Sequence, residues 1–242
     1  MLGLGNSLAT SAAAPSEWTP ASVSSLIHWY KYDTDISTYT QSSTSSNVLV
    51  TQWSDQKGTN HLVDSSTPAD GTSAGVSYNQ ATPKLVSGVV TFDHGNDQLD
   101  LSSPVSLGAF AVYVRMKTTD TGFGDYIFEG NASNFIKIQT STEARFKISG
   151  SRHDFTLPVT LGTSYFNIGF ERASDDALSI FINNQASSKS GTGDGTEEIA
   201  NTLDITKLGD PINPSSVQEV VIFNAPLSAS DRVELNNYFD NI

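Results

Sequence analysis

The chain has 242 residues and no cysteine, and it carries 13 Lys and Arg against 26 Asp and Glu, a formal net charge of −13. The absence of cysteine excludes disulfides, thiolate zinc sites and cysteine nucleophiles. The acidic balance, without a Lys/Arg cluster, disfavours nucleic acid and anionic membranes as partners. No run approaches the roughly eighteen consecutive apolar residues of a transmembrane helix, so none is predicted.

The first 17 residues lack the pattern of a buried core. SAAAP at 11–15 has the form of a signal-peptidase site, but no Lys or Arg precedes it, and polar residues and glycines interrupt the apolar run. We therefore predict a flexible arm over residues 1–17, able to add as an extended strand to the sheet of a neighbouring subunit. The predicted anchoring residues are Leu2, Gly3, Leu4, Gly5 and Leu8.

Residues 18–242 are predicted to form one domain, which opens with a short helical turn. Thr19 is placed to cap that turn and Pro20 to occupy its first position. Strand candidates follow at short spacing, separated by turns rich in Gly, Asn and Asp, which indicates a β-sandwich or barrel. They are residues 26–33, 47–55, 60–64, 89–93, 97–101, 110–118, 125–130, 134–140, 144–149, 153–157, 165–173, 177–183, 199–209 and 217–227.

The alternation of apolar and polar residues indicates the kind of sheet. Phe146 and Ile148 are expected on one face of their strand and Arg145 and Lys147 on the other, as in a half-buried antiparallel sheet. Residues 109–114 and 219–223 are apolar on both faces, which predicts central strands.

The C-terminal residues predict one amphipathic helix over 228–241. Ser228 is its expected N-cap, with Asp231 three residues later in the place of a capping-box Glu. An apolar stripe at i, i+3, i+4 and i+7 is expected to pack on the β body. Its residues are Leu235, Tyr238, Phe239 and Ile242.

GVVTFDHGNDQLDL, residues 88–101, holds the densest mixture of carboxylate, imidazole and amide in the chain. Val90 and Phe92 are expected to point inward before the chain reverses direction, and Leu99 and Leu101 to point inward after it. We interpret the stretch as a β-hairpin whose polar residues 93–97 form the turn.

Six segments in this order resemble the concanavalin A-like lectin/glucanase family, in its laminin-G-like branch. This resemblance implies a jelly-roll β-sandwich of two antiparallel sheets over residues 18–242, with a C-terminal helix. The pattern departs at 182–184, where Asn-Asn replaces Asn-Gly, and at 93–95, where Asp-His-Gly replaces Asp-Gly. The segments are WTPASVSSLIHWYKYD (18–33), VTQWSDQKGTNHL (50–62), VVTFDHGNDQLDL (89–101), FAVYVRMKT (110–118), LSIFINN (178–184) and VQEVVIFNAPLSASDRVELNNYFDNI (217–242).

Catalysis is not expected. Glucanases that share this fold resemble one another in a Glu-x-Asp-x-Glu strand motif, which places the paired carboxylates on one face. No such motif occurs here: Glu219 stands alone, and Glu197 and Glu198 are adjacent and would point to opposite faces. We predict that the chain is not an enzyme.

The one cofactor that the resemblance suggests is a calcium ion. Laminin-G-like domains often bind Ca²⁺ at a loop rim through Asp side chains, and no other cofactor motif is present. The alternative, solvated carboxylates in turns, is the favoured explanation because an oxygen site needs several converging ligands. The candidate ligands are Asp97, Asp194, Asp210 and Asp125.

A sugar site needs an aromatic platform with a few fixed polar groups. Trp18, Trp29 and Trp53 all fall in segments with a structural pattern. The candidate platform is therefore formed by aromatic residues in or beside loops, with ordinary packing or isolated exposure as the favoured alternative. They are Tyr39, Tyr78, Phe123 and Tyr126.

The arm followed by this domain also resembles virion proteins of tailed bacteriophages. The first functional hypothesis is a non-catalytic structural or decoration protein of a virion, which binds other virion proteins and itself through the arm and displays a lectin-like domain. The alternative is a carbohydrate-binding adhesin or fibre domain, extracellular or on a cell surface, that recognises host-surface glycans.

Overall fold

A computed structural model describes residues 17–40, 48–64, 82–93, 97–118, 124, 126–190, 201–209 and 215–242. Within these ranges no helix is long and apolar enough to cross a membrane. The described chain is almost entirely β-structure, with a 3₁₀ turn, η1 (Pro20–Ser22), and one helix, α1 (Ala229–Asp240).

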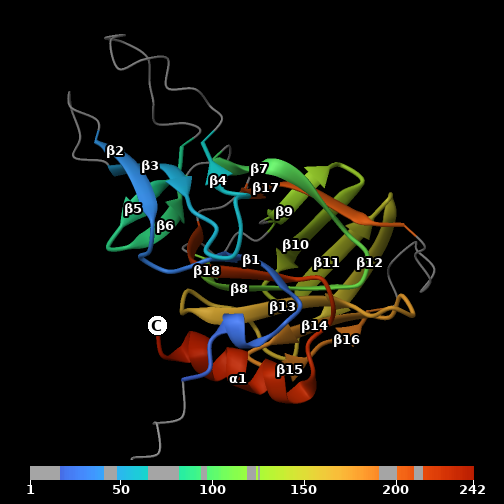
Figure 1. The fold of residues 1–242 in the computed structure, drawn as a ribbon. Coiled ribbons are helices and arrows are strands. Elements are labelled where there is room, and N and C mark those ends of the chain that lie inside the picture. The colour runs from blue at the N-terminus through green and yellow to red at the C-terminus, as the bar shows by residue number, and fades with distance from the viewer. Residues whose placement is uncertain are drawn as a thin grey trace, which may run out of the picture.

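The strands form two antiparallel sheets packed face to face (Figure 1). The first sheet contains, in spatial order, β1 (Leu26–Tyr30), β18 (Ser215–Phe223), β8 (Phe110–Thr118), β13 (Phe166–Arg172), β14 (Leu178–Ile182) and β15 (Gln185–Ala186), with β6 (Val89–Phe92) beside the start of β18. The second contains β4 (Leu62–Val63), β7 (Gln98–Leu107), β17 (Leu203–Gly209), β9 (Tyr126–Asn131), β10 (Asn134–Thr140), β11 (Glu143–Ile148), β12 (Ser151–Thr156) and β16 (Ser188–Lys189).

Three further strands connect the two sheets at one end. β3 (Val48–Trp53) pairs with β4 of the second sheet, with β2 (Ile36–Thr40), and with β5 (Lys84–Val86), which in turn pairs with β6 of the first sheet. The predicted fold class, an all-β sandwich of two antiparallel sheets with a C-terminal helix, is confirmed.

The main core lies between the sheets. Phe146 of β11 contacts Phe110 of β8 and Phe170 of β13, with ring centroids 6.3 and 5.2 Å apart, so aromatic side chains join the two layers. Phe146 and Ile148 are buried while Arg145 and Lys147 are not, as their alternation predicts. β8 and β18 each pair with strands on both sides, which confirms the prediction of central strands.

A second core lies on the outer face of the first sheet, beneath α1. Leu235 and Phe239 of the helix are fully buried against apolar side chains that point away from the main core. The molecule therefore has three layers, sheet, sheet and helix (Figure 1). The partners of the helix are Leu26, Ala111, Tyr113, Val221, Phe223 and Leu227.

Polar contacts fix α1 to the sheet and start the helix as predicted. The Tyr113 hydroxyl donates to Glu171 Oε1 (2.7 Å), and Arg232 Nη1 donates to Glu171 Oε2 (3.2 Å). Gly169 leaves room for the tyrosine, because a Cβ there would lie 2.1 Å from Tyr113 Cε1. Ser228 Oγ accepts from the Asp231 N–H at 3.1 Å, the expected N-cap bond.

The segment 88–101 is not the hairpin that its turn chemistry predicts. β6 pairs with β5 and β18 in the first sheet, whereas β7 pairs with β4 and β17 in the second. Among the described residues these two strands share no ladder, so Asp93 follows a strand of the first sheet and Asp97 precedes a strand of the second. The predicted inward residues, Val90, Phe92, Leu99 and Leu101, are nevertheless all buried.

Two turns have clear physical reasons. Asn183 and Asn184 have φ of 47° and 63°, so asparagine supplies the left-handed conformations of the two-residue turn between β14 and β15. In the WSDQKG turn, Asp55 Oδ1 accepts from the Trp29 and Lys57 N–H groups (3.0 and 2.9 Å), and its Oδ2 lies 2.8 Å from His28 Nδ1. The carboxylate thus ties the turn to β1.

Candidate functional site

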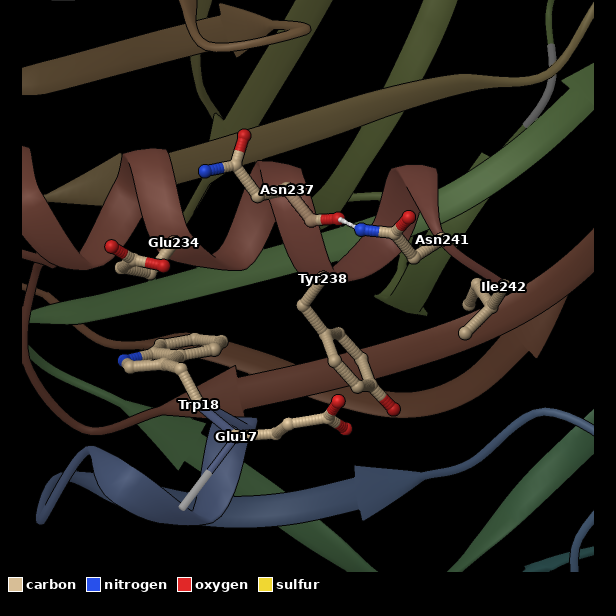
Figure 2. Close-up of a pocket in the computed structure, with 7 residues that line it drawn as sticks. All are labelled: Glu17, Trp18, Glu234, Asn237, Tyr238, Asn241 and Ile242. Carbon is tan, nitrogen blue, oxygen red and sulfur yellow. Dashed lines mark hydrogen bonds between the residues drawn. The ribbon is translucent and has the colours of Figure 1, made fainter. Parts of the chain in front are cut away.

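An open hollow of about 590 Å³ lies between α1 and the segment that leads into η1. Figure 2 shows the Trp18 and Tyr238 rings next to each other, with polar side chains around them. Residues from opposite ends of the chain meet there because α1 packs beside η1 and β1. The lining residues are Glu17, Trp18, Glu234, Asn237, Tyr238, Asn241 and Ile242.

The aromatic part of the hollow is an ordered set of three rings. The Trp18 and Tyr238 centroids lie 6.3 Å apart, and the Trp29 ring meets Tyr238 edge-on at 6.4 Å. Trp18 and Tyr238 are half-buried, so each ring is held on one side and reaches the hollow on the other. Large aromatic surfaces with a polar end, held in this way, suit ligands with both apolar and hydroxyl faces.

Glu219 of β18 holds two of these rings, Trp29 and Tyr238, in place. This fully buried carboxylate accepts the Trp29 indole N–H at 2.6 Å and the Tyr238 O–H at 2.7 Å on Oε1, and the Tyr32 N–H at 3.1 Å on Oε2. Burial raises the pKa of Glu219 above its usual range, although these hydrogen bonds and Lys31 oppose the rise. Burial and the neighbouring Glu219 also raise the pKa of Tyr238, which therefore remains a neutral hydrogen-bond donor.

Amides and carboxylates form the rim of the hollow. Glu17, Glu234, Asn237 and Asn241 are all exposed, and Asn241 Nδ2 donates to the main-chain oxygen of Asn237 at 2.7 Å. The rim therefore offers both donors and acceptors, one amide being held by the end of the helix. An aromatic floor with a few convergent polar groups is the pattern of a site that binds a sugar or another polyhydroxylated ligand.

Comparison with known proteins bears on the fold. No protein-family model matches the chain, and no curated protein matches it. Solved structures do match. One is botulinum neurotoxin type C, whose cell entry is reported to depend on two ganglioside molecules (TM-score 0.57, 12% identity, covering 89% of this chain and 51% of that chain). Another is Trypanosoma rangeli sialidase in complex with sialic acid (TM-score 0.51, 12% identity, covering 90% of this chain and 33% of that chain).

A third match is the binding domain of botulinum neurotoxin DC in complex with SialylT (TM-score 0.50, 14% identity, 66% of this chain and 45% of that chain). The chain spans about half of these toxin chains and a third of the sialidase chain. At such low identity the likeness shows the fold alone, a β-sandwich of the lectin-like kind.

The predicted aromatic platform is not assembled by the residues that the structure describes. Tyr39 lies on β2 and is 39% exposed, whereas Tyr126 lies on β9, where its ring meets Phe135 with centroids 4.9 Å apart. β2 pairs with β3 and β9 pairs with β10 and β17, so the two tyrosines belong to different parts of the sandwich. Tyr78 and Phe123 lie outside the described residues.

The calcium prediction stays a prediction. Asp97 is fully buried, and its Oδ2 accepts the Asp93 N–H at 2.8 Å, the capping contact expected of a turn carboxylate. Asp125, Asp194 and Asp210 lie outside the described residues. In the described ranges, no group of three His, Asp or Glu side chains is placed to hold a metal ion.

The anchoring residues Leu2, Gly3, Leu4, Gly5 and Leu8 also lie outside the described residues. Of the arm, only Glu17 is described, and it lines the hollow.

Sequence patterns alone missed the hollow. Trp18 was assigned a structural role because it begins the first folded segment, and Tyr238 because it continues the apolar stripe of the helix. Both assignments are right in part, since each ring packs against its neighbour. A usable signal was the position of Tyr238 and Ile242 at the edge of that stripe, opposite an N-terminal tryptophan.

Proposed function

We propose that this chain is a non-catalytic carbohydrate-binding module and that the Trp18–Tyr238 hollow is its binding site. The observation that carries the proposal is the Trp18–Tyr238 ring pair, in which Tyr238 is held by the buried Glu219 and which exposed amides and carboxylates border. Because the platform is fixed before a ligand arrives, binding would not require ordering of the rings.

The structural neighbours support a glycan ligand at the level of the fold. One is a toxin whose cell entry is reported to depend on two ganglioside molecules, a second is a toxin binding domain in complex with SialylT, and a third is a sialidase in complex with sialic acid. The hollow itself is open and half polar, which suits a terminal sugar or a short branch better than an apolar molecule.

A non-catalytic role agrees with the hydrogen bonds that the two buried glutamates accept. Glu171 accepts hydrogen bonds from Tyr113 and Arg232, and Glu219 from Trp29, Tyr32 and Tyr238, so both are committed to holding side chains in place. Hydrolysis of a sialyl or glucan substrate by the purified chain, abolished by replacement of either glutamate, would contradict this part of the proposal.

A glycan array with the purified full chain tests the binding proposal, followed by titration of the best ligand. Trp18→Ala should weaken binding at least tenfold, about 1.4 kcal/mol. Tyr39→Ala is the matched control, because it removes an exposed aromatic ring from a distant strand and should leave affinity unchanged. Loss of binding in the control but not in Trp18→Ala would place the site elsewhere.

A virion role is a second proposal, supported by the sequence of residues 1–17. Small residues and glycines there suit an arm that pairs with a neighbouring sheet edge or threads between subunits, and repeated weak contacts in a lattice would give firm attachment. Its partners would be other virion proteins and further copies of the chain.

Deletion of residues 1–17 should leave the domain folded but abolish its incorporation into particles, as measured by mass spectrometry of purified virions. Normal incorporation would refute the arm's role.

A further inference from the structure

The outer face of the second sheet gathers positive charge in an acidic protein. Residues 134–156, which form β10, β11 and β12, contain four cations and two carboxylates, a net +2 in a chain of net −13. Alternation fixes where these side chains lie, because Ile136, Phe146 and Ile148 point into the main core. These three strands lie in the layer opposite α1 (Figure 1), whose residues line the hollow.

The strand register brings like charges directly opposite each other. Lys147 of β11 faces Arg152 of β12, and Lys137 of β10 faces Arg145 of β11. Such cross-strand pairs destabilise a sheet. Two such pairs side by side are unusual in a chain whose acidic residues outnumber its basic ones two to one. Local conflicts of this kind are expected where a protein binds something.

One buried carboxylate offsets part of this charge. Asp154 accepts from Arg145 Nε at 2.5 Å and from Arg152 Nε at 2.9 Å, and it is almost fully buried. Burial alone would raise the pKa of Asp154, but the two guanidinium groups outweigh that effect and lower it. The carboxylate therefore stays ionised and holds both arginines in fixed positions, with the Arg152 side chain 38% exposed.

Lysines complete the surface. The Lys147 ammonium lies 5.9 Å from the centroid of the Phe135 ring and forms no ion pair with any described residue. Lys137 is buried, with its ammonium 4.8 Å from the centre of the Tyr126 ring, so it adds charge behind this surface. The cations that reach the surface, Arg145, Lys147 and Arg152, lie on the neighbouring strands β11 and β12, which are about 4.8 Å apart.

We propose that this face binds an acidic polysaccharide, a sugar chain that bears sulfate or carboxylate groups. Fixed guanidinium and ammonium groups in rows match anionic groups spaced along an extended chain. Nucleic acid is disfavoured, because its dense charge would meet the strongly acidic remainder of the protein. This site is separate from the hollow, so neither proposal depends on the other.

The test is binding of the full chain to immobilised heparin, with polygalacturonate as a carboxylate-only chain and dextran as a neutral one, over a series of salt concentrations. The key variant is Lys147→Glu, which converts a like-charge pair into an opposite-charge pair. It should lose at least tenfold in affinity for the acidic chains, while its melting temperature stays equal or rises. If Lys147 served stability alone, the variant would have a lower melting temperature and unchanged affinity for the acidic chains.

Lys117→Glu is the matched control, since it makes the same charge change on the outer face of the first sheet and should bind within twofold of the unmodified chain. Trp18→Ala should likewise leave heparin binding unchanged. Equal losses in the two lysine variants, or no binding to any acidic polysaccharide at low salt, would overturn the proposal. Tighter binding to DNA or to polyglutamate, with the same dependence on Lys147, would overturn the assigned ligand class.

Discussion

The two outer faces of the sandwich are built on the same alternation but used differently. On β8 and β18 of the first sheet the outward residues include Ala111, Tyr113, Val221 and Phe223, and α1 covers them. On β10 to β12 of the second sheet the outward residues are mainly charged, and no described helix covers them. A strand that is apolar on both faces therefore predicts a third layer, whereas strands with charged residues on one face predict a face that no helix covers.

Loss of helix packing should have the largest effect. Phe239→Ala removes a fully buried ring from the second core and should lower the free energy of unfolding by about 3–5 kcal/mol. Val233→Ala, at a helix position 43% exposed, should cost less than about 0.5 kcal/mol. Urea denaturation measures both. Similar small losses in the two variants would mean that α1 does not depend on the second core.

The next largest effect should come from Glu219→Gln. The glutamine amide N–H₂ would face a donor, either the Tyr32 N–H or the Trp29 and Tyr238 pair, and one buried group would lose its partner, at about 2–3 kcal/mol. Glycan binding should weaken as well, because Tyr238 loses its fixed position. Glu234→Gln, an exposed carboxylate of the same hollow, is the control and should change stability by less than about 0.5 kcal/mol. Unchanged unfolding of Glu219→Gln would contradict the role assigned to the carboxylate.

Much of the fold follows from local sequence. Strand alternation, the Ser228 cap and the Asn183–Asn184 turn were all predictable, because each depends on residues a few positions apart. The hairpin prediction for 88–101 was wrong because turn chemistry does not determine whether the flanking strands pair or enter different sheets. The hollow was missed for a related reason: Trp18 and Tyr238 are 220 positions apart, and only packing of the complete chain brings them together.

The two faces should also respond oppositely to pH. Asp154, like Asp55, has a lowered pKa, so its stabilising contribution is present above about pH 4 and is lost as the pH falls through its folded pKa. Burial raises the pKa of Glu171 and Glu219, so their contribution is complete below about pH 4 and is lost as the pH rises through their folded pKa.

Urea midpoints between pH 3 and 8 measure this difference. Asp154→Asn should lose less stability than the unmodified chain on acidification below pH 4. Glu219→Gln should lose less on the rise from pH 5 to pH 8. Parallel curves for the three proteins would show that these carboxylates do not set the pH dependence.

The smallest expected effect is that of calcium, whose predicted ligands lie, in sequence, outside β8, β18 and β10 to β12. If Asp97 and its predicted partners bind Ca²⁺, millimolar Ca²⁺ should raise the melting temperature by linkage, whereas Mg²⁺ at the same concentration should not. An unchanged melting temperature in Ca²⁺ would remove the calcium prediction and leave Asp97 as the cap of the Asp93 amide.

The most direct test of the carbohydrate site is an NMR titration that follows the three tryptophan indole N–H signals while the best array ligand is added. Trp53 is the internal reference, because it is fully buried and its Nε1–H donates to the Lys31 carbonyl at 2.9 Å. We predict that the Trp18 signal shifts in proportion to saturation while the Trp53 signal stays in place. Saturation of the glycan with no change at Trp18 would contradict the proposed site.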